Sequence, residues 1–190
     1  ALQANLAYAS DPDVTGMALT ALYPYRDQPE VAAAAEEAFA CLSAMQHDNG
    51  TFASGGSECS ESCAWVIVST TAWGINPDTD SRFIKNGNSV VDALLAHYLE
   101  DEKMFQHIIG AGSNAMATDQ SCYGLVAYDR FINGKAALYD YSDVTFEIPA
   151  DPETDEMTAT LGLPAEINGG DSFNGVISIN KWDNEAGYKL

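Results

Sequence analysis

A repeated pattern of residues constrains the fold of this chain more than any other feature. Three segments, residues 13–22, 61–70 and 119–128, share one order of side-chain types. Each has a carboxylate, then a bulky side chain four residues on, then an aliphatic one two residues further: Asp13, Met17 and Leu19; Glu61, Trp65 and Ile67; Asp119, Tyr123 and Leu125. Sequence repeats of about this spacing indicate stacked helical pairs. We therefore expect three equivalent helices with a carboxylate at each start, where the helix dipole favours negative charge.

Two further amphipathic segments lie between the repeats and predict connecting helices. Residues 29–45 are rich in alanine, and residues 89–98 have apolar side chains at helical spacing. In the first segment the apolar stripe contains Val31, Ala35, Ala38, Phe39 and Leu42. Helix boundaries are indicated by Asp11-Pro12 at the first start and by Asn49-Gly50, Gly74-Ile-Asn-Pro77 and Asn133-Gly134 as stops. The predicted order alternates repeat and connecting helices.

The pattern changes near residue 140, where helical spacing gives way to alternation. Residues 144–148, 158–163 and 173–179 are expected to be strands. Three strands are too few for a complete β-sandwich. The sequence thus predicts a mainly α chain with two parts, a helical repeat domain over 1–143 and a β segment over 144–190, the latter an incomplete sandwich.

The charge of the chain excludes some partners. Eight Lys and Arg stand against 28 Asp and Glu, a net charge of −20. Nucleic acids and anionic membrane surfaces are disfavoured, because both need clustered positive charge. Membrane insertion is not expected either, since no apolar run reaches about 18 residues. The chain is nevertheless 46% hydrophobic, which predicts a folded protein rather than an acidic disordered tail.

Several motifs resemble the prenyltransferase and squalene-oxidase repeat superfamily. Residues 13–22 resemble its repeat helices, and Gln46-His-Asp-Asn-Gly-Thr-Phe52 is similar to its Q-x-x-(D/N)-G-x-F turn. Residues 76–89 and 116–135 are similar to a subset found in large surface proteins of Gram-positive bacteria. The resemblance covers roughly residues 10–143.

This resemblance implies an α/α toroid, in which inner helices line a cavity and outer helices surround it. The five expected helices would form only part of such a ring. It also implies an extracellular location at the cell wall or cell surface, and the β segment would begin an immunoglobulin-like domain. The sequence begins at Ala1 rather than Met and shows no signal-peptide pattern, so earlier removal of a signal peptide is one alternative.

The candidate ligand site is the cavity that the repeat helices would line, formed by Asp13, Glu61, Asp119, Met17, Trp65 and Tyr123. The expected function is a non-catalytic ligand-binding or adhesive module, whose partner is a small molecule, a glycan or a component of the host or cell wall. Self-association is a further alternative. So is an enzyme that uses cavity carboxylates, either terpene-cyclase-like or glycan-cleaving. The cyclase reading is weakened because Asp11-Pro-Asp13-Val14 lacks the last acid of a D-x-D-D cluster.

No cofactor or metal site is expected. The protein prenyltransferases of this superfamily hold zinc with Asp, Cys and His, but His47, His97 and His107 form no ligand pattern with a cysteine. The four cysteines also lack a C-x-x-C pair. Acidic loops at 78–80 and 151–155 depart from the spacing of an EF-hand, and turn formation explains their residues equally well.

Cys59 and Cys63 are candidates for a disulfide. Within one helix their Cβ atoms would lie about 5–6 Å apart, too far for a bridge. The pairing therefore requires Cys59 to lie just before the helix, which the preceding Gly55-Gly56-Ser57 permits. Cys41 and Cys122 are expected to be separate thiols.

Overall fold

The computed structural model describes residues 10–145, 158–162 and 176–180, the last two ranges as backbone only. The chain divides into two compact units, Ala1–Val144 and Thr145–Leu190. The described part of the first unit is mainly helical, with five α-helices and two 3₁₀ turns: α1 Pro12–Leu22, η2 Tyr23–Tyr25, α2 Pro29–Met45, α3 Ser60–Ala72, η3 Ser81–Phe83, α4 Val90–Leu95 and α5 Ala115–Ile132. No helix in these described residues is long and apolar enough to cross a membrane.

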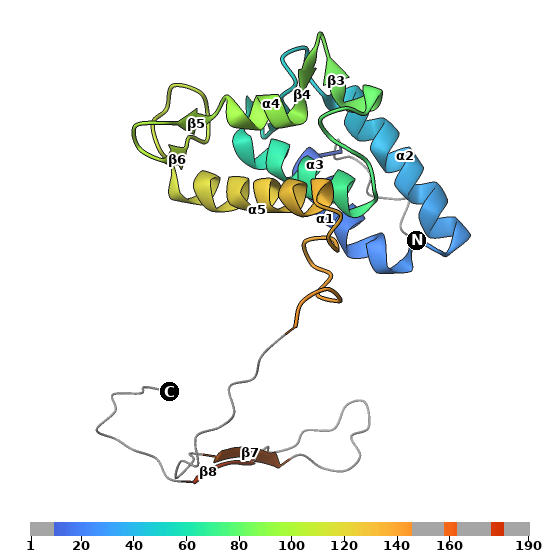
Figure 1. The fold of residues 1–190 in the computed structure, drawn as a ribbon, viewed down its shortest axis with the longest axis vertical. Coiled ribbons are helices and arrows are strands. Elements are labelled where there is room, and N and C mark those ends of the chain that lie inside the picture. Colours follow the sequence, from blue (N-terminus) through green and yellow to red (C-terminus); the bar gives the residue numbers. More distant parts are fainter. Residues whose placement is uncertain (1–9, 146–157, 163–175, 181–190) are drawn as a thin grey trace. The chain divides into compact units, whose positions relative to one another are not determined.

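Helix α3 is the centre of this unit. Every one of its residues except Trp65 is buried. It contacts α1, α4 and α5, and Figure 1 shows α4 and α5 running alongside it. A helix that is buried on all sides needs no polar face, and most of α3 is apolar or carries small hydroxyl side chains, several bonded to the helix's own carbonyls.

The hydrophobic core takes side chains from all five α-helices of this unit. Its largest fully buried apolar side chains are Phe39, Phe52, Phe83, Leu19, Leu42, Ile67 and Leu94. The ring of Phe39 meets the rings of Trp73 and Phe83 edge to face, at centroid distances of 5.9 and 6.4 Å. Edge-to-face packing is a favoured arrangement of aromatic rings, and it joins α2 to the loop after α3.

A carboxylate lies at the start of the helix, as predicted, in two of the three repeats. Asp11 caps α1 through its Oδ1 atom, which accepts from the backbone N–H of Asp13 at 2.9 Å. Asp13 and Glu61 both lie one residue after the first residue of their helices. Asp119 does not, because Asn114 caps α5 and starts that helix four residues before the expected acid. The expectation of a carboxylate at every repeat start is therefore wrong for α5.

The connecting helices differ in how closely they follow the prediction. Helix α2 has the predicted bounds, Pro29–Met45, and the predicted stop signal Asn49-Gly50 lies in the turn that follows it. Helix α4 is shorter than the predicted 89–98, since its last residues form a hairpin strand. The stops at Gly74 and Gly134 are confirmed, and both glycines have the positive φ typical of a helix end.

Three short antiparallel hairpins separate the helices. They pair β1 (Ala53–Ser54) with β2 (Ser57–Glu58), β3 (Ile84–Lys85) with β4 (Asn88–Ser89), and β5 (Tyr98–Leu99) with β6 (Met104–Phe105). Sequence alternation does not predict these strands, because two residues are too few to show a period.

The turn after α2 is held by a buried glutamine. The side-chain N–H₂ of Gln46 donates to the carbonyls of Gly50 at 3.0 Å and Phe83 at 2.9 Å. This fixes the segment that resembles the Q-x-x-(D/N)-G-x-F turn against η3.

The second unit contains one described strand pair. Strands β7 (Thr158–Gly162) and β8 (Val176–Asn180) are antiparallel, with Thr160 opposite Ser178. Strand β7 lies within the predicted 158–163, and β8 overlaps the predicted 173–179 and ends one residue beyond it. Of the predicted strand 144–148, residues 144 and 145 are not in a strand, and the remainder lies outside the described residues.

Candidate functional site

The first candidate site is a pocket of about 210 Å³ at the N-terminal ends of α1 and α3, which we call the acidic pocket. It is lined by Asp13, Met17, Ser54, Gly55, Cys59, Glu61, His107, Met116 and Gln120. Its ionisable groups are two carboxylates, a thiol and an imidazole, between the thioethers of two methionines. The pocket therefore combines titratable groups with an apolar rim.

Glu61 and His107 form the central contact of the acidic pocket. The Nδ1 atom of His107 lies 2.8 Å from Oε2 of Glu61, whose side chain is only 5% exposed. The loop that carries His107 is fixed against α3 because the backbone N–H of Ser60 donates to the His107 carbonyl at 3.2 Å. The hydroxyl of Ser60 also donates to Oε2. The other carboxylate oxygen, Oε1, is buried and has no hydrogen-bond partner.

Asp13 contributes a second unpaired oxygen. Its Oδ1 atom is buried without a hydrogen-bond partner. Burial raises the pKa of Asp13 above its ordinary value, and the negative charges of Asp11 and Glu61 add to this, against a hydrogen bond from Ser62 that lowers it. Two buried carboxylate oxygens thus stand ready to accept from a donor or to bind a cation.

The structure gathers only part of the predicted cavity lining. Asp13, Met17 and Glu61 line the acidic pocket. Asp119 lies further along α5 on its exposed side, where it accepts a hydrogen bond from the Tyr123 hydroxyl at 2.9 Å. Neither lines a pocket described here, because α5 buries a different face, the one that carries Ala117, Ser121, Gly124 and Ala127.

Trp65 is a structural residue rather than a member of the pocket lining. Its indole N–H donates to Oε1 of Gln120 at 2.9 Å, so the ring joins α3 to α5. The side chain is half-buried between these helices. The sequence predicts that Trp65 lines a ligand cavity, but it forms a contact between α3 and α5 instead.

The expected disulfide between Cys59 and Cys63 is not formed, and all four cysteines of the chain are free thiols. Cys59 does lie just before α3, as the pairing requires. Its Sγ atom contacts the hydroxyl of Ser62 at 3.1 Å instead. Complete burial raises the pKa of Cys63 to about 12, so this thiol stays protonated at neutral pH.

The second candidate site is a pocket of about 410 Å³ near the opposite end of α3, which we call the tyrosine pocket. Aromatic and aliphatic side chains line most of it, with one cation and one anion: Thr20, Tyr23, Pro24, Arg26, Val68, Ala72, Ala137, Leu138, Tyr139, Asp140 and Tyr141. Three tyrosines with a few polar groups are typical of a ligand pocket.

One wall of the tyrosine pocket is rigid. The guanidinium of Arg26 lies over the ring of Tyr23, 4.2 Å from its centroid. Arg26 also donates to the Tyr23 carbonyl at 3.1 Å. The ring of Trp73 packs edge-on against Tyr23 at a centroid distance of 6.1 Å. Tyr23 is therefore fixed by a cation–π contact and by ring packing.

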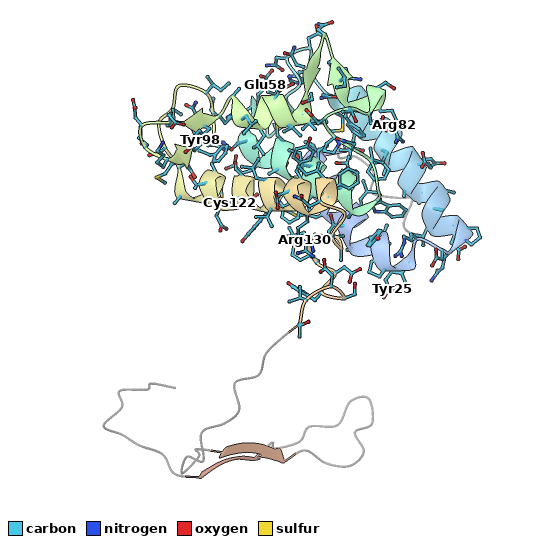
Figure 2. The ribbon with its side chains drawn as sticks, viewed as in Figure 1. Tyr25, Glu58, Arg82, Tyr98, Cys122 and Arg130 are labelled. Carbon is cyan, nitrogen blue, oxygen red and sulfur yellow. The ribbon has the colours of Figure 1, made fainter. Side chains whose placement is uncertain are left out.

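The other wall is the segment that follows α5, and an ion pair holds it in place. Arg130 donates to Asp143 Oδ1 at 2.6 Å and to the Ala136 carbonyl at 2.9 Å. The backbone N–H of Ala136 in turn donates to Asp143 Oδ2 at 3.0 Å. We call this arrangement the Arg130 clip, and it closes the loop that carries Tyr139 and Tyr141 (Figure 2 labels Arg130).

Both tyrosines on this wall have solvent-exposed side chains. Tyr139 is 51% exposed and Tyr141 is 59% exposed. Burial of part of the ring, with a smaller effect of Tyr141, raises the pKa of Tyr139, so its hydroxyl remains a donor at neutral pH. Large exposed aromatic side chains beside a pocket are typical of a recognition surface.

The sequence pattern predicts neither His107 nor the tyrosine pocket. His107 is separated from Glu61 by 46 residues and comes from an irregular loop. The segment 137–141 resembles a linker, and its only signal is the pair of tyrosines in Tyr139-Asp-Tyr141. Comparison of the chain with protein-family models, with curated proteins and with solved structures finds no match.

Proposed function

We propose that this chain is a non-catalytic ligand-binding module of an extracellular bacterial surface protein. In this proposal α1, α3 and α5 are inner helices of a partial α/α toroid, α2 and α4 are outer helices, and the second unit begins an immunoglobulin-like sandwich. The repeated residue pattern and the position of α3 between α1 and α5 support the toroid. The net charge of −20 supports an exterior that stays solvated outside the cell.

The ligand is a saccharide, bound in the tyrosine pocket. The flat faces of tyrosine rings suit the C–H face of a sugar ring, while their hydroxyls can donate to its oxygens. Arg26 supplies further donors and Asp140 supplies acceptors at the same pocket. Phosphorylated ligands are disfavoured, because the net negative charge of the chain repels them.

The observation that carries this proposal is the ring of Tyr23. It is held between Arg26 and Trp73 before any ligand arrives, opposite the exposed rings of Tyr139 and Tyr141. A pre-organised aromatic wall reduces the entropy cost of binding. That arrangement favours recognition over chemistry, since no pair of carboxylates lines this pocket.

Calorimetric titration with a panel of neutral oligosaccharides tests the proposal. We expect at least one member to bind, and Tyr139→Ala to weaken its binding by at least about tenfold, the effect of losing a buried aromatic contact. Tyr25→Ala is the matched control, because Tyr25 is 55% exposed and does not line the pocket (Figure 2). Equal weakening in both variants, or no binding by any member, would contradict the proposal.

One observation favours a second function, a glycan-cleaving enzyme. Asp13 and Glu61 line the same pocket, and the pKa of Asp13 is raised, as a general acid requires. Release of reducing ends from the same oligosaccharides, abolished in Asp13→Asn and retained in Asp119→Asn, would establish it. Asp119 is a suitable control because it is an exposed acid outside the pocket.

A further inference from the structure

A side-chain cluster in the acidic pocket has the composition of a transition-metal site. The Sγ atom of Cys59, a carboxylate oxygen of Glu61 and a ring nitrogen of His107 all lie within 4.8 Å of one another. Atoms that bind one zinc ion lie about 2.0–2.3 Å from the metal, so they are separated from each other by somewhat less than 4.8 Å. Small side-chain rotations are enough to bring the three onto one ion.

Glu61 gives an independent indication of a missing ligand. The residue is 4% exposed, and it lines the pocket with its Oε1 atom buried and without a partner. A buried acceptor without a partner costs about 1–3 kcal/mol. A bound cation would satisfy this oxygen.

The backbone holds the three side chains close together. Cys59 is the N-cap of α3 and Glu61 follows two residues later, in the first turn of the same helix. The hydrogen bond from the Ser60 N–H to the His107 carbonyl fixes the third side chain beside them. The protein therefore has little conformational entropy to lose when the site closes on an ion.

The chemistry of the ligands selects the class of metal. A thiolate and an imidazole favour zinc and similar transition metals, whereas calcium and magnesium prefer sites made only of oxygen. A thiolate and a carboxylate also balance the charge of a divalent ion, while His107 binds as the neutral imidazole.

We propose that Cys59, Glu61 and His107 bind a divalent transition-metal ion, with zinc as the preferred metal. Binding releases the thiol proton of Cys59 to solvent, and three protein ligands leave a fourth coordination position for water or a ligand. This site is separate from the tyrosine pocket, and the proposal does not depend on saccharide binding.

Titration of the reduced full chain with Co²⁺ tests the proposal. Cobalt bound to a cysteine thiolate has a near-ultraviolet charge-transfer band that no other protein ligand produces. We expect this band in the unmodified chain and its loss on addition of Zn²⁺. Cys59→Ser should abolish the band. His107→Gln should weaken Co²⁺ binding by at least about tenfold, because even residues outside the ligand shell typically contribute 10- to 100-fold.

Cys122→Ser is the matched control, since Cys122 is an exposed thiol on α5 (Figure 2). It should keep the full band. Far-ultraviolet circular dichroism without metal shows whether each variant is folded. If Cys59→Ser does not fold, His107→Gln provides the test, because the His107 side chain is 39% exposed and lies on a loop rather than in the core. A missing band in the unmodified chain, a band that persists in folded Cys59→Ser, or unweakened binding in His107→Gln would overturn the proposal.

Discussion

Gly16 of α1 lies directly against the backbone of Trp65 in α3. A Cβ atom placed on Gly16 would be 2.8 Å from the Trp65 carbonyl oxygen and 3.0 Å from its carbonyl carbon. Gly124 of α5 repeats this relationship on the other side, where a Cβ would be 3.0 Å from the Cα of Ala64. The central helix is thus approached closely from both sides, at positions where only glycine fits.

Replacement of Gly16 by alanine should therefore destabilise the protein. In an open helix this change is expected to be stabilising by roughly 0.5–1 kcal/mol. Here we expect a loss of about 1–3 kcal/mol, because the methyl group overlaps backbone atoms that cannot move aside. Urea denaturation measures the change in the free energy of unfolding. Val14→Ala, at an exposed position of the same helix, should change it by no more than about 0.5 kcal/mol. A Gly16→Ala variant as stable as the unmodified chain would show that α1 and α3 are less closely packed.

Gln46 should contribute to stability through its two donated hydrogen bonds. Gln46→Leu removes both donors from the buried carbonyls of Gly50 and Phe83, so we expect a loss of about 1–3 kcal/mol in the free energy of unfolding. Gln28→Leu is the comparison, because Gln28 is exposed and its side chain caps nothing. Similar losses of unfolding free energy in both variants would show that the two hydrogen bonds of Gln46 do not stabilise the fold.

The Arg130 clip should support ligand binding rather than core stability. Arg130→Gln releases Asp143 and loosens the loop that carries Tyr139, so we expect saccharide binding to weaken by about fivefold, equivalent to roughly 1 kcal/mol. Arg82→Gln breaks a comparable pair with Asp80 outside the tyrosine pocket and should leave binding unchanged. An unchanged saccharide affinity in Arg130→Gln would show that the Arg130 clip does not support ligand binding.

The same clip should respond to acid. The pKa of Asp143 is lowered below its ordinary value of 3.8, first by the backbone N–H of Ala136 and then by Arg130, while partial desolvation acts in the opposite direction. A lowered pKa means that the contribution of Asp143 is fully present above the ordinary value and is lost as the pH falls through the lowered one. We expect the chemical shifts of the Ala136 amide to stay constant from neutral pH down to about 4 and to change only below that. A change near pH 6 would contradict this assignment.

Helices with strong local signals could be predicted well from the sequence. Helix α2 has the predicted bounds because its apolar stripe and the proline at its start agree. The cap at Asp11 follows from the preference of Asp for that position. The start of α5 could not be predicted from the repeat, since Asn114 competes with Asp119 as the start signal and lies outside the repeated pattern.

The candidate sites could be predicted less completely from the sequence. Asp13 and Glu61 come together because they occupy equivalent first-turn positions on neighbouring helices, which the repeat predicts. His107 and Tyr139 reach their pockets through loops, whose conformation depends on long-range hydrogen bonds such as those of Ser60 and Arg130. No periodic pattern encodes such contacts.

A crystal structure of the chain with the oligosaccharide that binds most tightly would show directly whether the tyrosine pocket is the ligand site. We expect a sugar ring in the tyrosine pocket, stacked on Tyr23 or Tyr139, with Arg26 or Asp140 hydrogen-bonded to its hydroxyls. A sugar bound in the acidic pocket between Asp13 and Glu61, with the tyrosine pocket unchanged, would contradict this expectation and would favour the enzyme instead.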